Sequence, residues 1–254
     1  MLLQSLLRPL LTPLMRGMFD APIASSPAWS PADLVSLGAW YDPSDLSTMF
    51  QDAAGTTPVT AAGQPVGLIL DKSGNGYHAS QSTSTARPLF QIDGGGNAYL
   101  SFDGVDDILI CSSITIPQPY TVFAGAHVLA TQSCIHSSLG VGMSISQIIA
   151  PFGNAIDMYA GSHLSGGPAI GFGNPVVLAL VYDGASAYNR KNGVLNASGD
   201  VGTDGVVGNL MVGSDNYTFL NGKIYQFILG AASYDAATIL KAETWVADKT
   251  GVTL

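Results

Sequence analysis

The chain has little charge and hardly any glutamate. Only 11% of its 254 residues are charged, and seventeen aspartates stand against a single glutamate, Glu243. Aspartate favours turns and caps whereas glutamate favours helices, so this imbalance predicts a loop-rich β protein. The basic residues are few and scattered, and the net charge is −9. We therefore expect no nucleic-acid partner, because such binding needs a basic patch that faces the phosphates.

The motifs of common enzyme classes are also missing. The sequence contains no Gly-x-Ser-x-Gly elbow, no Walker loop and no His-Glu-x-x-His motif. Its four histidines, at positions 78, 127, 136 and 163, are far from one another in the sequence. We expect them to be structural residues, and we predict no catalytic residues and no enzyme activity.

Cysteine and long apolar runs are scarce as well. Cys111 and Cys134 are too few for a disulfide framework and too far apart for a paired metal site. Two buried thiols are the expectation, and a Cys111–Cys134 disulfide is the alternative that the spacing leaves open. No run of 18 uncharged apolar residues occurs, so no membrane span is expected.

The most apolar stretch is the first nineteen residues, which do not match a signal peptide. Arg8 and Arg16 interrupt the apolar run, Pro9 and Pro13 punctuate it, and no Ala-x-Ala site follows. The apolar residues recur every four positions and would form a stripe that needs a partner surface. We predict an assembly arm within an arm and linker of residues 1–36. Its contact residues are Leu2, Leu3, Leu6, Leu7, Leu10, Leu11, Leu14, Met15, Met18 and Phe19.

Short apolar runs separated by Gly, Asn, Asp and Ser fill the rest of the chain and predict an all-β sandwich or barrel. The Asn192-Gly193 pair predicts a type I′ hairpin turn. Ile239, Ala242 and Val246 recur at helical spacing and predict a C-terminal helix ended by Gly251. The predicted strands are Ala39–Tyr41, Val66–Asp71, Ala98–Phe102, Ile108–Cys111, Thr121–Leu129, Ser144–Ala150, Ala155–Ala160, Val176–Tyr182, Ala187–Arg190, Val194–Ala197, Leu210–Val212 and Lys223–Leu229.

Three stretches, taken in order, resemble the concanavalin A-like, laminin-G-like jelly-roll superfamily. The first combines DKSGNGYHA, from Asp71, with YLSFDGVDDIL, from Tyr99. The others are residues 176–198, with the Asn-Gly hairpin, and residues 210–251, where a last strand runs into a helix. The resemblance implies a jelly-roll β-sandwich of two antiparallel sheets over residues 37–254, with an N-terminal arm and a C-terminal helix. The Glu-x-Asp-x-Glu motif of the glucanases with this fold is absent.

A narrower resemblance, over residues 40–76, is to virion proteins of tailed bacteriophages and prophages that carry such a jelly roll. It implies a structural component of the tail or baseplate, made in the host cytoplasm without a signal peptide and located in the phage particle. Its arm would join other virion proteins, and the protein would self-associate, with a trimer as the expected state. The alternatives are a lectin-type carbohydrate-binding module that acts as a receptor-binding protein, or a capsid decoration protein.

Two loops are candidate ligand sites in this interpretation. Asp103, Asp106 and Asp107 cluster around an Asp-Gly turn, which is either a Ca²⁺ site or a turn in which Asp bonds its own backbone. Tyr217, with Asp215 and Asn216 beside it, is the candidate contact with host-surface polysaccharide, since aromatic rings and polar groups together suit a sugar. No cofactor other than Ca²⁺ is expected.

Overall fold

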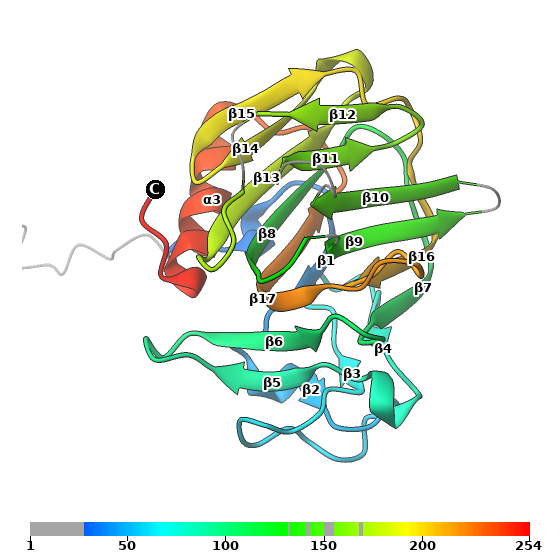
Figure 1. Cartoon of the computed structure of the whole chain (residues 1–254), viewed down its shortest axis with the longest axis vertical. Helices are drawn as coiled ribbons and strands as arrows, with labels where there is room; N and C mark the ends of the chain where they lie inside the picture. The colour runs from blue at the N-terminus through cyan, green and yellow to red at the C-terminus, as the bar shows by residue number, and fades with distance from the viewer. Residues whose placement is uncertain (1–27, 132, 141–142, 150–154, 168–169) are drawn as a thin grey trace, which may run out of the picture.

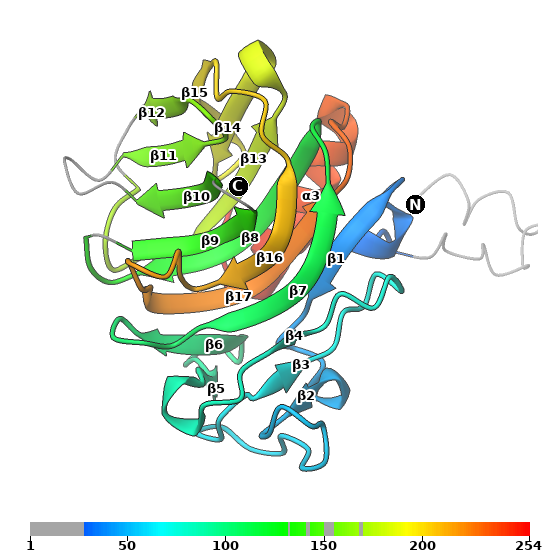
Figure 2. The same cartoon turned by 90° about the vertical axis from the view of Figure 1, so that its right-hand side faces the viewer.

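Two antiparallel sheets face each other across an apolar core, and a C-terminal helix covers the outer face of one of them (Figures 1 and 2). The computed structural model describes residues 28–131, 133–140, 143–149, 155–167 and 170–254. The expected β-sandwich with a C-terminal helix is confirmed. No helix among these residues is long and apolar enough to cross a membrane.

The first sheet has the strand order β15-β14-β13-β8-β17-β6-β5, and β1 also pairs with β17. Strand β17 therefore lies at its centre. It pairs with β8 along its length, with β6 near its start and with β1 near its end. The strands are β1 Leu37–Tyr41, β5 Leu89–Ile92, β6 Ala98–Asp103, β8 Tyr120–Val128, β13 Val176–Tyr182, β14 Ala187–Lys191, β15 Val194–Gly199 and β17 Asn221–Gly230.

The second sheet has the order β12-β11-β10-β9-β16-β7-β4-β3-β2. Long, curved β7 and β16 lie side by side in it (Figure 2). The strands are β2 Met49–Phe50, β3 Leu68–Ile69, β4 Ala79–Ser80, β7 Leu109–Ile116, β9 Ser133–Gly140, β10 Met143–Ile149, β11 Ile156–Tyr159, β12 His163–Gly166 and β16 Val206–Val212. Short 3-10 turns are η2 Pro31–Asp33, η3 Leu46–Thr48, η4 Ser84–Ala86 and η5 Gly184–Ser186.

Helix α3, Ala236–Thr250, packs on the outer face of the first sheet (Figure 1). Asp235 caps it by accepting a hydrogen bond from the Thr238 amide, and Gly251 ends it in the left-handed conformation. The helix approaches β8 so closely that a Cβ at Gly125 would lie 2.4 Å from the Thr250 methyl group. A larger residue at this position would push the helix off the sheet.

Most predicted strands occur, with changed ends. Val176–Tyr182 forms β13 at those bounds, and all seven of its side chains are buried because α3 covers one face and the core the other. Asn192 and Gly193 both have positive φ, 49° and 78°, as a type I′ turn requires. The predicted strand Val66–Asp71 is shorter, with only Leu68–Ile69 paired as β3. Cys111 and Cys134 are both buried and free, so the disulfide alternative does not hold.

Candidate functional site

Tyr217 stands out from the loop between β16 and β17, with 90% of its surface exposed. The buried carboxylate of Asp215 fixes the backbone beneath it. Asp215 Oδ1 accepts hydrogen bonds from the Tyr217 amide at 3.0 Å and from the Thr218 amide at 2.6 Å. The Ser137 hydroxyl donates to the Ser214 carbonyl at 2.8 Å, which ties the loop to β9. The ring is therefore exposed on a backbone that is already ordered.

The same loop is anchored to the core by Gly213. Its φ is 89°, and a Cβ there would lie 2.3 Å from the ring of buried Phe102, so no other residue fits. The Leu220 amide donates to the Gly213 carbonyl at 2.8 Å and closes the loop. Asn216, with φ of 72°, turns the chain between the two anchors. The sequence-predicted group of Asp215, Asn216 and Tyr217 thus lies on a short, tightly closed loop.

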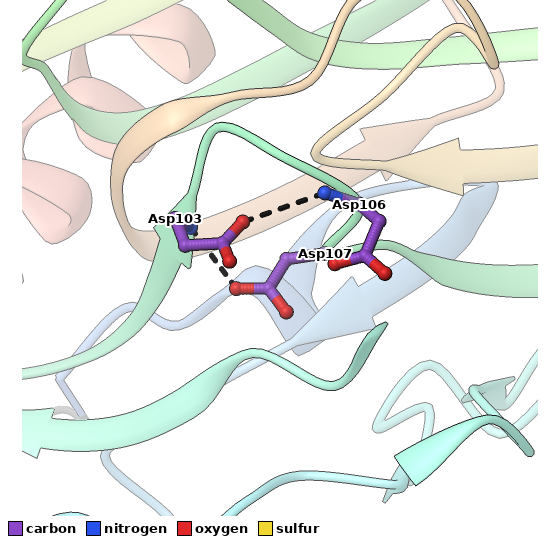
Figure 3. A group of neighbouring side chains, drawn as sticks. All are labelled: Asp103, Asp106 and Asp107. Carbon is purple, nitrogen blue, oxygen red and sulfur yellow. Dashed lines mark hydrogen bonds between the residues drawn. The ribbon is translucent and has the colours of Figure 1, made fainter. Parts of the chain in front are cut away.

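In the second candidate site, Asp103 is the last residue of β6, and Asp106 and Asp107 lie on the loop between β6 and β7 (Figure 3). One carboxylate oxygen from each lies within 4.8 Å of the others. Asp107 Oδ2 accepts from the Asp103 amide at 3.0 Å, and Asp103 Oδ1 accepts from the Val105 amide at 2.8 Å. Burial raises the pKa of Asp107 to about 6, and the charges of Asp103 and Asp106 add to the shift.

These residues fit a calcium ion in donor type and charge. Ca²⁺ takes oxygen ligands, and its charge would relieve the repulsion that raises the pKa of Asp107. The backbone hydrogen bonds use one oxygen of Asp103 and one of Asp107, so each retains a second oxygen for a ligand. The same bonds also make a normal Asp-Gly turn, so both sequence-based interpretations match this geometry.

The two candidate loops lie side by side at one end of the sandwich. Asp103 ends β6 and pairs with Asn221, the first residue of β17. A Cβ at Gly104 would lie 2.8 Å from the Asn221 Cβ, so the β6–β7 loop packs on the base of the Tyr217 loop. The Leu129 amide donates to the Asn221 carbonyl and brings the β8–β9 turn to the same end. We call this end, formed by residues 103–108, 129–131 and 213–221, the tyrosine rim.

The SGNG motif has a structural role. The Asp71 carboxylate accepts hydrogen bonds from the Trp40 and Ser73 amides through Oδ1, and from the Ser73 hydroxyl and the Tyr77 amide through Oδ2. Asn75 Nδ2 donates to two carbonyls of β1. Asp71 Oδ1 thus joins the loop to β1, whereas Oδ2 holds the loop's own backbone in shape.

Glu243 is fully buried on α3, where its carboxylate pairs with Arg190 at 2.9 Å and 3.1 Å. Because the carboxylate is fully buried between the sheet and Arg190, a substrate in solution cannot reach it. The sequence's one glutamate is therefore a structural residue.

The histidines differ from one another more than expected. The His136 ring is buried between Tyr182 and Phe227, with no hydrogen bond to its nitrogens from the described residues. His163 has 65% of its side chain exposed, and its Nδ1 lies 3.0 Å from Asp157 Oδ2. His136 matches the expected structural role, whereas His163 belongs to the polar surface of β12.

The ten residues of the predicted assembly arm, from Leu2 to Phe19, lie outside the described residues. A cavity that no sequence motif predicts lies at the end of the sandwich opposite the tyrosine rim, lined in part by Thr115, Asp183 and Thr203. These residues come from strand β7 and two loops, all far apart in the chain, and no local motif marks them.

The fold and its loop-built ends define a jelly-roll-like β-sandwich domain. No family model and no curated protein matches the chain. Among solved structures, it is similar to a GH54 α-L-arabinofuranosidase soaked with 4-nitrophenyl α-L-arabinofuranoside, with 14% identity and a TM-score of 0.59 over 87% of this chain and 66% of that one. It is also similar to the binding domain of Paraclostridial Mosquitocidal Protein 1, with 10% identity and a TM-score of 0.55 over 86% of this chain and 53% of that one.

Trypanosoma rangeli sialidase matches with 11% identity and a TM-score of 0.48. The alignment covers the whole of this chain but only 39% of the sialidase. At such identities, the two matches with TM-scores above 0.5 establish the shared fold and nothing about activity.

Proposed function

We propose that this domain is a carbohydrate-binding module of the lectin type, and that the tyrosine rim contacts the sugar. The observation that carries the proposal is the 90% exposed ring of Tyr217 on a loop that Asp215 has already ordered. A single exposed aromatic side chain is common on a soluble domain, so the support comes from the ordered loop that presents this ring beside polar groups. The similarity in fold to an arabinofuranosidase soaked with an arabinofuranoside supports the same class of ligand.

The geometry suits a sugar in two respects. An aromatic ring offers an apolar face to the C–H groups of a pyranose or furanose, and nearby polar groups fix its orientation. Asn216 is exposed beside the ring and offers an amide that both donates and accepts. Because the loop is closed before the ligand arrives, binding loses little backbone entropy.

Binding without hydrolysis is the activity we infer. A glycosidase needs a carboxylic acid and a second carboxylate on either side of the bond. The one glutamate is buried in an ion pair with Arg190. Asp103, Asp106 and Asp107 are grouped together rather than placed across a cleft, and we propose that these three residues hold Ca²⁺ and stabilise the base of the Tyr217 loop. Asp215, on the Tyr217 loop itself, accepts hydrogen bonds from that loop's own amides.

The test is a glycan array followed by titration of the sugars that bind. Tyr217→Ala should weaken binding at least tenfold, whereas Tyr217→Phe should retain most of it because stacking needs the ring and not the hydroxyl. Leu195→Ala is the matched surface control, because Leu195 is 58% exposed on β15, away from the rim. Unchanged binding by Tyr217→Ala would remove the tyrosine rim as the site.

We also propose, as a second candidate, that the module is carried on a tailed-phage particle as a tail or baseplate component that self-associates. The resemblance of residues 40–76 to virion proteins supports this role. Mass spectrometry of purified particles would test it, with a variant that lacks residues 1–19 as the comparison. If the protein is absent from particles, the virion role is wrong; equal incorporation of both forms would refute the assembly arm alone.

A further inference from the structure

A cavity of about 470 Å³, open to solvent and lined in part by exposed residues, lies at the opposite end of the sandwich from the tyrosine rim. Thr115 and Val207 line it from β7 and β16, the two prolines 117 and 119 from the β7–β8 loop, and Asp183 and Thr203 from two further loops. Its volume is within the range of sites that hold small molecules. It is therefore large enough for one or two sugar units.

The side chain of Gln118 holds the three loops in place. Its Nε2 donates to the Asp204 carbonyl at 2.8 Å and to the Gly202 carbonyl at 3.1 Å. Its Oε1 accepts from the Gly184 amide at 2.7 Å. One amide thus joins the β7–β8 loop to η5 and to the loop before β16, so the cavity has a fixed shape before any ligand binds.

The chemistry of the lining points to a neutral, hydroxyl-rich ligand. The carboxylate of Asp183 and the hydroxyls of Thr115 and Thr203 make no hydrogen bond to another described side chain or backbone group. A free carboxylate accepts hydrogen bonds from adjacent hydroxyls, and the proline rings and Val207 provide an apolar floor for C–H groups. No lysine, arginine or histidine among the described residues lines the cavity, so an acidic sugar would meet an unpaired negative charge there.

We propose that this cavity binds a unit of a neutral carbohydrate and that the domain therefore has two sugar sites. This inference rests on the proposal that the module binds carbohydrate, but not on the role of Tyr217. Strand β7, Leu109–Ile116, begins at the tyrosine rim and ends at the cavity. At about 3.3 Å per residue, the two ends lie about 23 Å apart. Two such sites would let one domain hold two chains of a polysaccharide, or two segments of the same chain.

The test uses the full chain and a panel of neutral disaccharides with gluco, galacto, manno and arabino configuration, plus one uronic-acid disaccharide. Saturation-transfer NMR detects binding, and native mass spectrometry counts the bound molecules. Thr203→Trp fills the cavity, and Asp183→Asn removes the charge at constant shape. Ala185→Trp is the matched control, because Ala185 is exposed in the same segment as Asp183 but does not line the cavity.

We expect two bound molecules on the wild type and on Ala185→Trp, and one on Thr203→Trp. Asp183→Asn should weaken the cavity site about tenfold, and the uronic-acid disaccharide should not occupy it. If Thr203→Trp and Asp183→Asn bind like the wild type, the cavity is not a site, while the proposed function stands. If only Tyr217→Ala leaves binding unchanged, the tyrosine rim is not a sugar site, and the proposal for the cavity stands. If no neutral sugar binds the wild type, both proposals are wrong.

Discussion

His136 makes the fold sensitive to acid. The side chain lies on β9 with 1% of its surface exposed, and its ring packs against Phe227 at 5.5 Å and against the edge of Tyr182 at 6.5 Å between ring centres. Neither ring nitrogen has a hydrogen-bond partner among the described residues. Burial therefore lowers the pKa of His136 from 6.5 to about 4, because the charged imidazolium has no solvation in this position.

The size of the effect follows from linkage. The unfolded chain binds a proton at this residue below pH 6.5, whereas the folded chain binds it only near pH 4. Protonation thus favours the unfolded state across this window, and stability falls as the pH drops from 6.5 to 4. Each pKa unit corresponds to about 1.4 kcal/mol, so the loss is about 3 kcal/mol.

The assay is urea denaturation of the wild type and of His136→Phe at several pH values between 7.5 and 4. Phenylalanine keeps a ring between Tyr182 and Phe227 but does not titrate. Other ionisable groups affect both proteins equally, so the difference in unfolding free energy isolates His136. We expect the wild type to lose about 3 kcal/mol relative to His136→Phe over this range.

The control is His163→Phe, which also removes one histidine but from an exposed position. Its pH dependence should follow that of the wild type much more closely. The reasoning is refuted if His136→Phe and the wild type lose stability in parallel. An NMR titration that places the His136 pKa near 6.5 would refute it as well.

Two further predictions concern the loops. In EDTA at pH 8, Asp107→Asn should raise the unfolding free energy by about 1 kcal/mol. The pKa of Asp107 is raised to about 6, so its ionised form destabilises the fold above pH 6, and this penalty is lost as the pH falls through 6 and the carboxylate binds a proton. Added Ca²⁺ should raise the melting temperature of the wild type but not of this variant, and calorimetry with no calcium heat on the wild type would contradict the metal site. Asp71→Asn should lower the unfolding free energy measured by urea denaturation by about 2–3 kcal/mol, because the new amide group replaces an oxygen that accepts two hydrogen bonds. A loss below about 0.5 kcal/mol would mean that these hydrogen bonds do not stabilise the loop.

The sequence-based predictions were best where local chemistry decides the structure. Strand β13 is apolar at all seven positions because it is covered on both faces, and such a run is visible in the sequence. Asn192-Gly193 and Gly251 occur where the chain needs positive φ, and few residues other than Asn and Gly adopt it readily. Turn and cap residues therefore predicted the boundaries of these elements.

Other elements had no local signal. Strand β9, Ser133–Gly140, is rich in serine and contains His136, yet Ser137 and Ser138 are both buried. Its pairing with β16 and β10 is set by tertiary contacts between distant segments. The same reason applies to the cavity, since Thr115, Asp183 and Thr203 meet only after both sheets have formed. The Asp103 and Tyr217 loops were found in the sequence because each is short and rich in turn residues.

The place of β17 at the centre of the first sheet has a consequence for synthesis. Until residues 221–230 leave the ribosome, β8 on one side and β6 with β1 on the other have no strand between them. The nascent chain therefore carries two unpaired edges, which are surfaces that promote aggregation. Helix α3 follows directly and covers the completed sheet. A chain that stops short of residue 230 is thus expected to aggregate rather than fold, and the domain should acquire its structure in one late step.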